Sequence, residues 1–250
     1  MAVYRVFRLL LMLLLAAACS GAHAAAVPET AAPPAEELPL EPFSATYRAT
    51  IDKGVSLDGS ATIRLSPQEN GVWQYQFKVN SFIADLNESL LFNWRDNQVI
   101  PLRYRYKLSG MLIRNRQNAL DFDWRNHQAT GSIKGRKVSL PLESGLLDPL
   151  GYQVQMSQDI RAGKTDVSYK VANHKGYDTD RFMVLGEETI STSLGDLHTI
   201  KVEKVRGEGS KRETLMWFAP DLNYLLVRLN QQEPDGTRYA IHIDTADINR

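Results

Sequence analysis

The sequence predicts a mainly β protein: a strongly curved antiparallel sheet or open β-barrel with one packed α-helix. Apolar and polar side chains alternate with a period of two in most segments after residue 42. Short turns rich in Gly, Pro, Asp and Asn separate these segments. Because one face of each alternating segment is apolar and the other polar, we expect one side of the sheet on a core and the other in water.

The first 24 residues have the pattern of a secretory signal peptide. Two arginines precede an apolar run over residues 9–18, and small residues follow it. This run is shorter than the roughly 20 residues of a bilayer span, and no later segment is more apolar. We favour cleavage before Ala25, which predicts a protein of the Gram-negative periplasm. The alternative is a lipoprotein whose lipidated first residue is Cys19.

Residues 25–42 form a linker rich in Ala, Pro and Glu. Proline fixes φ and cannot join a strand ladder, so we expect an extended segment: a tether of a lipidated chain or a frayed N-terminus. A single β-rich domain is expected over residues 43–250. Since Cys19 is the only cysteine, this domain must be stabilised by its core without disulfides.

The alternation predicts strands in both halves of this domain. In the first half they are residues 43–51, 72–79, 101–108 and 119–124. In the second half they are residues 167–172, 180–192, 197–205, 212–219, 224–231 and 237–243. Short turn-rich stretches at residues 52–54, 67–71, 96–97, 109–110, 126–127 and 135–136 predict an antiparallel meander.

One helix is predicted within residues 146–164. Asp148 is the expected N-cap and Pro149 the expected first helical residue, while Gly163 ends the helix. The apolar face is expected at intervals of four residues: Tyr152, Met156 and Ile160. The glutamines of the helix are expected to face water or the rim of the sheet.

Three segments resemble a known family. They read LLDPLGYQVQMSQDIRAG from Leu146, LGDLHTIKVEKVRG from Leu194 and RETLMWFAPDLNYLLVRL from Arg212. In this order they resemble the bacterial family called domain of unknown function 3108, and WFAPD at residues 217–221 is the most specific part. YLLVRL at residues 224–229 departs from the proline-led strand of many members. The resemblance implies a secreted β-rich fold and no activity; a likeness to periplasmic lipoprotein carriers rests on fold analogy alone.

Aromatic side chains on the apolar faces form the first candidate binding site. They are expected on facing sides of successive strands, where they would line a concave surface closed by the helix, as in barrels that bind lipids. The candidate residues are Trp73, Tyr75, Phe77, Tyr104, Tyr106, Phe122 and Trp124, with Tyr152 and Met156 of the helix. The simpler interpretation is that these side chains only fill the core.

A row of basic side chains is the second candidate site. Arg103 and Arg105, with Arg114 and Arg116 beyond the next turn, would form a patch able to hold a phosphate headgroup or an acidic partner. The alternative, which we favour, is a solvated face balanced across the hairpin by carboxylates such as Asp121.

Charge and motif content disfavour several function classes. Lys+Arg and Asp+Glu both number 29, so no basic excess indicates nucleic-acid binding. The sequence contains no G-x-S-x-G, S-x-x-K or phosphate-loop motif. His242 and Asp244 are expected to share a strand face, but no third metal ligand has a recognisable spacing. We therefore expect neither an enzyme nor a cofactor.

These features predict a non-catalytic exported protein that binds an apolar or amphipathic envelope molecule, such as a lipid, in its curved sheet. The alternative is an envelope assembly factor that presents a sheet edge or charged face to a partner protein. A continuous apolar cavity would favour the first function. A closed core with a long exposed edge would favour the second.

Overall fold

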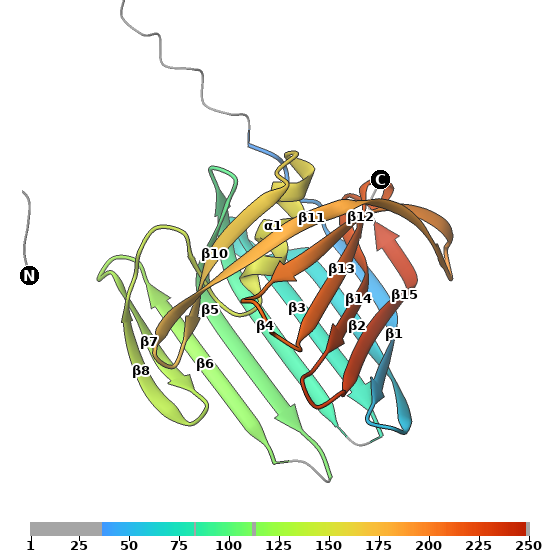
Figure 1. Ribbon diagram of the computed structural model, residues 1–250. Coiled ribbons are helices and arrows are strands. Elements are labelled where there is room, and N and C mark those ends of the chain that lie inside the picture. Colours follow the sequence, from blue (N-terminus) through green and yellow to red (C-terminus); the bar gives the residue numbers. More distant parts are fainter. Residues whose placement is uncertain (1–36, 83, 112–113, 249–250) are drawn as a thin grey trace, which may run out of the picture. The chain divides into compact units, whose positions relative to one another are not determined.

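A computed structural model describes residues 37–82, 84–111 and 114–248 (Figure 1). They belong to one compact unit, Glu36–Arg250. The predicted signal peptide, Cys19 and most of the predicted linker lie outside the described residues. Within the described ranges, no helix is long and apolar enough to cross a membrane.

The first half of this unit is an up-and-down meander. Its strands are β1 (Phe43–Asp52), β2 (Ser56–Pro67), β3 (Val72–Ser81), β4 (Asp85–Arg95), β5 (Gln98–Ser109), β6 (Arg116–Asp123), β7 (Gln128–Ile133) and β8 (Arg136–Pro141). A short 3-10 turn, η1 (Glu69–Gly71), lies between β2 and β3. Each strand pairs antiparallel with its neighbour in the sequence, so the predicted meander is present. β1, β3, β5 and β6 correspond to predicted strands, whereas β2, β4, β7 and β8 were not predicted.

The second half continues the same sheet. After the helix α1 (Gly151–Arg161), the chain forms β10 (Asp166–Asn173), β11 (Gly176–Thr192), β12 (Gly195–Val205), β13 (Glu213–Ala219), the 3-10 turn η2 (Pro220–Leu222), β14 (Leu225–Gln232) and β15 (Arg238–Ile248). The short strand β9 (Leu146–Leu147) precedes α1 and pairs parallel with β10, whereas the other pairs are antiparallel.

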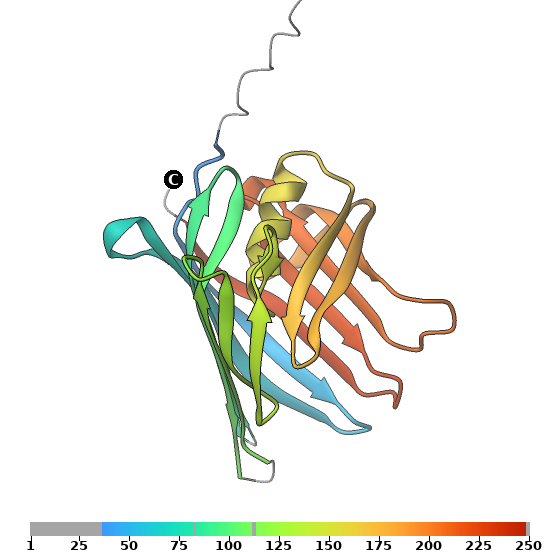
Figure 2. The same ribbon diagram turned by 90° about the vertical axis from the view of Figure 1, so that its left-hand side faces the viewer.

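The first and last strands of the unit, β1 and β15, pair with each other and so join the two halves of the sheet. β1 pairs with β15 from Phe43 opposite Ile248 to Asp52 opposite Arg238. The described strands therefore form one sheet with the order β8-β7-β6-β5-β4-β3-β2-β1-β15-β14-β13-β12-β11-β10-β9. Its edges, β8 and β9, do not pair with each other, so the sheet curves strongly without closing (Figures 1 and 2). The predicted fold class is confirmed.

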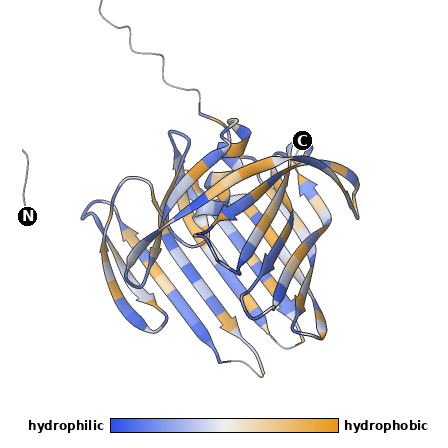
Figure 3. Ribbon diagram, in the orientation of Figure 1, coloured by the Kyte–Doolittle hydropathy of each residue, from blue (hydrophilic) through white to orange (hydrophobic). Residues whose placement is uncertain are grey.

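The concave face of the sheet carries the core. On β1, Ala45, Tyr47 and Ala49 are buried while the residues between them are more exposed. Figure 3 shows the resulting alternation of apolar and polar residues along the strands. The Tyr47 hydroxyl donates to the Leu226 carbonyl oxygen at 2.7 Å, so a hydrogen bond inside the curve also joins β1 to β14.

Bulges interrupt the alternation at several points. The register shifts leave one extra residue in each of four strands: Leu102, Leu185, Val227 and Asp244. An extra residue locally bends a strand and breaks its period of two. The regular alternation expected within residues 101–108 and 224–231 is therefore broken at Leu102 and Val227. Asp244 is the extra residue of β15, so the regular alternation that would place it on the same face as His242 is interrupted there.

The helix α1 lies at one end of the concave face (Figures 1 and 2). The predicted helix is confirmed, but Asp148 and Pro149 precede it and Leu150 occupies the N-cap position. Asp148 still satisfies the first turn, because its Oδ1 accepts hydrogen bonds from the amides of Leu150 at 2.9 Å and Gly151 at 3.1 Å.

Two features hold α1 close to the strands. A Cβ atom at Gly151 would lie 2.5 Å from Asp148 Oδ2 and 3.0 Å from Leu90 Cδ2, so a larger residue here would have to displace both side chains. Gln155 is buried, contrary to the prediction that the glutamines face water or the rim. Its side chain accepts a hydrogen bond from the Val99 amide at 2.8 Å and donates to the Asn97 carbonyl oxygen at 2.9 Å.

Residues just before β1 belong to the folded unit rather than to the predicted linker. Leu40 is buried. The Leu38 carbonyl oxygen accepts a hydrogen bond from Trp94 Nε1 at 2.8 Å, and the Leu38 amide donates to Asn97 Oδ1 at 2.7 Å. The segment is held against β4 and the turn that follows it because its backbone groups have partners there.

A candidate ligand-binding cavity

A cavity of about 680 Å³ lies inside the curve and extends from Gln153 of α1 to the turns that follow β1, β3 and β5. Most of its wall is apolar and comes from strands at the centre of the sheet. Examples are Ile63 on β2, Phe77 and Val79 on β3, Leu86 on β4, Leu229 on β14 and Ile241 on β15. Cavities of roughly 300–1,000 Å³ with apolar walls are typical binding sites for small molecules.

Strand register builds this wall as rows across the sheet. Val79 lies opposite Leu86, and Leu86 lies opposite Leu108. Since every second residue of a strand points to the same face, the neighbours in each row meet inside the curve. The same row continues to Arg116, which lies opposite Leu108 on β6. An apolar row therefore ends in a cation.

Basic side chains lie where the cavity meets solvent. Lys53, Arg114 and Arg116 contribute to its lining, and all three are exposed. Neither arginine forms an ion pair with another described residue. Their guanidinium groups are free to hold a carboxylate or phosphate, the groups with which arginine forms its strongest hydrogen bonds.

A polar residue that sequence analysis missed lies on the inner face next to the cavity. Glu88 of β4 is opposite Tyr106 in register, and it accepts a hydrogen bond of 2.5 Å from the Tyr104 hydroxyl. Burial raises the pKa of Glu88 to about 7; the bond from Tyr104 opposes this shift and the charge of Asp148 adds to it. In the alternation of β4, Glu88 occupies an apolar position between Leu86 and Leu90. This position in the sequence could have indicated that Glu88 faces the inside of the sheet.

Asp148 is a second carboxyl group in this region. It is fully buried, and its Oδ2 has no hydrogen-bond partner among the described residues. Burial raises the pKa of Asp148 to about 6, although the amides of Leu150 and Gly151 favour the charged form. Neither Asp148 nor Glu88 lines the larger cavity. Both carboxyl groups are therefore buried in the protein without belonging to the cavity wall.

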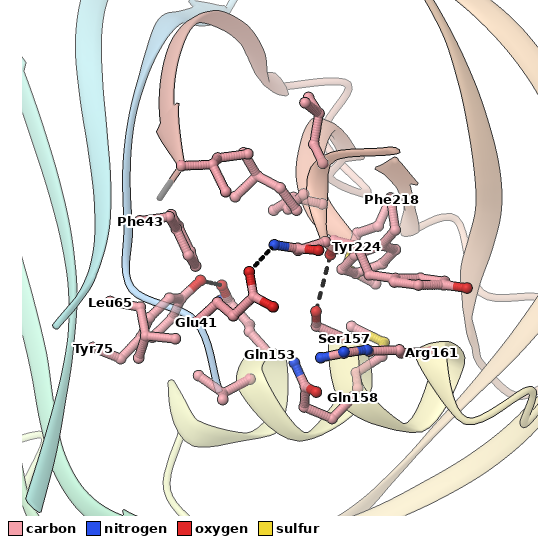
Figure 4. A pocket seen from close by; sticks show the side chains of 18 residues that line it. Glu41, Phe43, Leu65, Tyr75, Gln153, Ser157, Gln158, Arg161, Phe218 and Tyr224 are labelled. Carbon is pink, nitrogen blue, oxygen red and sulfur yellow. Dashed lines mark hydrogen bonds between the residues drawn. The ribbon is translucent and has the colours of Figure 1, made fainter. Parts of the chain in front are cut away.

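A smaller pocket lies between α1 and the strands (Figure 4). Its volume is about 40 Å³, space for roughly three water molecules. Polar contacts cross it: Ser157 Oγ donates to the Tyr224 carbonyl oxygen at 2.9 Å, and the Tyr75 hydroxyl donates to Gln153 Oε1 at 3.3 Å. This pocket is too small for a lipid-sized ligand, so the larger cavity is the candidate site.

The predicted aromatic residues divide between the two pockets and the core. Phe77 and Tyr106 line the larger cavity, and Tyr75 and Met156 line the smaller pocket. Tyr104 is buried against Glu88. Only part of the predicted set is therefore placed to touch a ligand in the larger cavity.

The remaining predicted aromatic residues have structural contacts. Phe122 is buried in the core and Trp73 packs against it. Trp124 Nε1 donates to the Pro101 carbonyl oxygen at 2.7 Å. Tyr152 stacks on Phe182 with 5.4 Å between the ring centroids. None of these four predicted residues lines the larger cavity.

The basic row separates into two groups. Arg103 Nε lies 3.2 Å from Asp121 Oδ1, and a terminal nitrogen of Arg105 lies 2.8 Å from the same atom. These two arginines alternate with Tyr104 and face the outside of the sheet, so they do not line the cavity. This is the balanced outer face that the alternative interpretation predicted. Arg114 and Arg116 belong to the cavity instead.

His242 lies on the outer face between two arginines. Arg48 and Arg228 are its partners in register on the neighbouring strands. Burial, followed by the charges of Arg228 and Arg48, lowers the pKa of His242. In the parts of the chain that the structure describes, no cluster of His, Cys, Asp or Glu could hold a metal ion.

Comparison with known families agrees with the fold. Residues 43–243 match the family described as "Protein of unknown function (DUF3108)". The chain belongs to this family. The match runs from β1 into β15, so it covers the candidate cavity and α1. The resemblance noted in the sequence is confirmed.

One similar solved structure is a β-barrel-like protein of domain of unknown function DUF1849 from Brucella abortus. Its TM-score is 0.58 at 10% sequence identity, and the match covers 84% of this chain and 99% of that chain. A putative lipoprotein from Parabacteroides distasonis has a TM-score of 0.31 and 13% identity, covering 83% and 96%. The first likeness supports the fold alone, and the second is too low to support an argument. No curated protein is significantly similar to this sequence.

Proposed function

We propose that this protein is a non-catalytic component of the cell envelope that binds an apolar or amphipathic molecule inside its curved sheet. The observation that carries this proposal is the cavity of about 680 Å³ with a largely apolar wall. The signal-peptide pattern of the first 24 residues supports export to the periplasm, with lipidation at Cys19 as the alternative.

The wall and the mouth of the cavity suit different parts of one ligand. Val79, Leu86 and Leu108 form an apolar row that matches an aliphatic chain. Arg114 and Arg116 lie at the end of that row and lack ion-pair partners among the described residues. A long-chain molecule with a carboxylate or phosphate head fits both features, because the chain is desolvated by the wall and the head pairs with arginine.

The alternative function, an assembly factor that uses a sheet edge, has less support. The edge strand β8 has six residues and the other edge strand, β9, has two. β8 also carries exposed Arg136 and Lys137. Short edges with basic side chains discourage the addition of a strand from another protein. The cavity and the short edges both favour ligand binding over edge pairing.

Titration with palmitate tests this proposal. We expect saturable binding to the purified chain, and we expect Val79→Trp to weaken it by about tenfold or more because the indole would occupy the cavity. Asn80→Trp is the matched control: Asn80 is the next residue on β3 and is exposed. The proposal fails if palmitate does not bind or if both variants have the same affinity.

A second comparison tests the role of the mouth. Replacing both Arg114 and Arg116 by glutamine should weaken palmitate binding several-fold, roughly the effect of losing a charge-assisted hydrogen bond. Binding of hexadecanol, which has the same chain and no charge, should not change. Equal losses for the two ligands would mean that the arginines do not recognise the headgroup.

A further inference from the structure

Three hairpin tips expose large apolar side chains. Val55 follows β1, Phe82 follows β3 and Met111 follows β5, and their exposed fractions are 71%, 90% and 78%. The other exposed large apolar side chains of the described ranges have values between 37% and 46%: Leu57, Tyr177, Met183, Leu185 and Leu194. The three highest values therefore occur on the hairpins β1–β2, β3–β4 and β5–β6.

The three tips lie at the same end of the sheet. In an antiparallel meander, every second connection falls at the same end, so the tips after β1, β3 and β5 lie together along the lower edge of Figure 1. The cavity opens at this end, because Lys53, Ala84 and Arg114 from the same three connections contribute to its lining. The exposed apolar side chains therefore lie beside the mouth of the cavity.

These side chains contribute nothing to the core. Val55, Phe82 and Met111 are absent from the set of residues that form the core or pack against it. Apolar side chains held in water on hairpin tips are typical of a surface that contacts another apolar phase. Three separate tips around an opening do not form the continuous face that a protein partner requires, but each tip can enter a lipid surface by itself.

The exposed arginines beside the tip of Met111 indicate the kind of lipid. Arg114 and Arg116 follow the tip of Met111, are exposed, and form no ion pair with other described residues. Cations next to inserted apolar side chains strengthen binding to bilayers with anionic headgroups. Long arginine side chains also reach phosphates while their stems remain near apolar groups.

We propose that the open end of the sheet docks onto an anionic lipid bilayer. Val55, Phe82 and Met111 insert among the headgroups, and Arg114 and Arg116 contact phosphates. The mouth of the cavity then faces the bilayer, so an apolar ligand can move between bilayer and cavity without crossing water. This last step rests on the proposed function, whereas docking itself does not.

Tryptophan quenching by brominated lipid tests the docking. The full chain with Phe82→Trp is mixed with vesicles of brominated phosphatidylglycerol, and Leu194→Trp, on the turn between β11 and β12, serves as the matched control. The four native tryptophans give the same background in both proteins. We expect quenching of the added tryptophan at 82 and none at 194. Quenching reports how deeply the side chain at position 82 enters the bilayer. A lipid anchor at Cys19 would hold the protein at the membrane without producing this quenching.

Second-site changes identify the other inserted residues. In the Phe82→Trp protein, replacing Val55 and Met111 by serine should raise the lipid concentration for half-maximal quenching about tenfold. The same replacements at Met183 and Leu185, which are exposed on β11, should leave it unchanged. Equal quenching at 82 and 194, or equal effects of the two serine pairs, would overturn the proposal.

The same proteins separate docking from ligand binding. Serine at Val55 and Met111 should leave palmitate affinity in the absence of vesicles unchanged, since neither side chain lines the cavity. Quenching without palmitate binding would leave docking standing and remove the proposed function. Palmitate binding without quenching would leave the proposed function standing and remove docking.

Discussion

The two ends of the curved sheet differ although the same strands build both. At the closed end, α1 fills the space between the strands and leaves a pocket of about 40 Å³. Buried polar contacts tie the helix down, such as that of Gln155 with the Val99 amide. At the open end, the strands enclose about 680 Å³ and the hairpin tips expose apolar side chains.

This difference indicates a division between stability and function. A tightly packed region loses contacts when a side chain is removed, and the surrounding structure relaxes only partly. A wall that already borders open space has fewer contacts to lose. We therefore infer that the closed end stabilises the fold and that the open end keeps room for a ligand.

The largest expected effect comes from removing side-chain volume at the closed end. Met156 on α1 is fully buried, so Met156→Ala should lower the free energy of unfolding by about 2–5 kcal/mol. Leu86→Ala in the cavity wall should lower it by about 1 kcal/mol, because the lost atoms already face open space. Urea unfolding of both variants measures the difference. Equal losses would mean that the open end is packed as tightly as the closed end.

A second effect concerns the buried carboxyl group of Glu88. Burial raises the pKa of Glu88 from 4.5 to about 7, so the folded state binds this proton more tightly than the unfolded state. The resulting contribution to stability is fully present below about pH 4.5 and is lost as the pH rises through about 7. Its upper limit is about 3 kcal/mol.

The variant Glu88→Gln isolates this contribution. Urea unfolding at intervals between pH 4.5 and 8 should show that the wild-type chain loses stability relative to the variant as the pH rises. The pKa of Asp148 is raised in the same direction, so Asp148 leaves a smaller slope of the same sign in the variant. Parallel pH profiles for the two proteins would show that the folded and unfolded states bind the Glu88 proton equally.

The smallest expected effect lies on the outer face. The side chains of Arg103 and Asp121 are 58% and 53% exposed, and ion pairs of this kind contribute about 0–1 kcal/mol. Arg103→Gln should therefore change the free energy of unfolding by no more than this and leave palmitate affinity unaltered. Arg116→Gln, on β6 at the cavity mouth, is the comparison. A loss of palmitate affinity in Arg103→Gln would place the headgroup site on the wrong face.

Much of the fold was predictable because its signals are local. Alternation identified the faces of β1, where Ala45, Tyr47 and Ala49 are buried as expected. The candidate site was predictable only in part: Phe77 and Tyr106 line the cavity, but Arg103 and Arg105 face outward. The sequence does not show which basic residues of the row face the cavity. Those beyond the turn, Arg114 and Arg116, lie at its mouth.

Bulges explain a further part of the difference between the predicted and the observed cavity residues. Val227 is an extra residue, so Leu226 and Leu229 both line the cavity although their spacing predicts opposite faces. The bulge depends on how β14 pairs with β13 and is not encoded by the alternation within β14 itself.

Ten of the fifteen described strands, the single helix and the family followed from the sequence, because alternation, turn chemistry and capping act between near neighbours. The strands β2, β4, β7, β8 and β9 were not identified. Tertiary structure alone decided which end is closed and which keeps a cavity. The contact of Gln155 with Val99 spans 56 residues, and that of Thr46 with Thr245 spans 199. Such contacts depend on how the whole sheet curves and pairs, so no pattern within one segment specifies them.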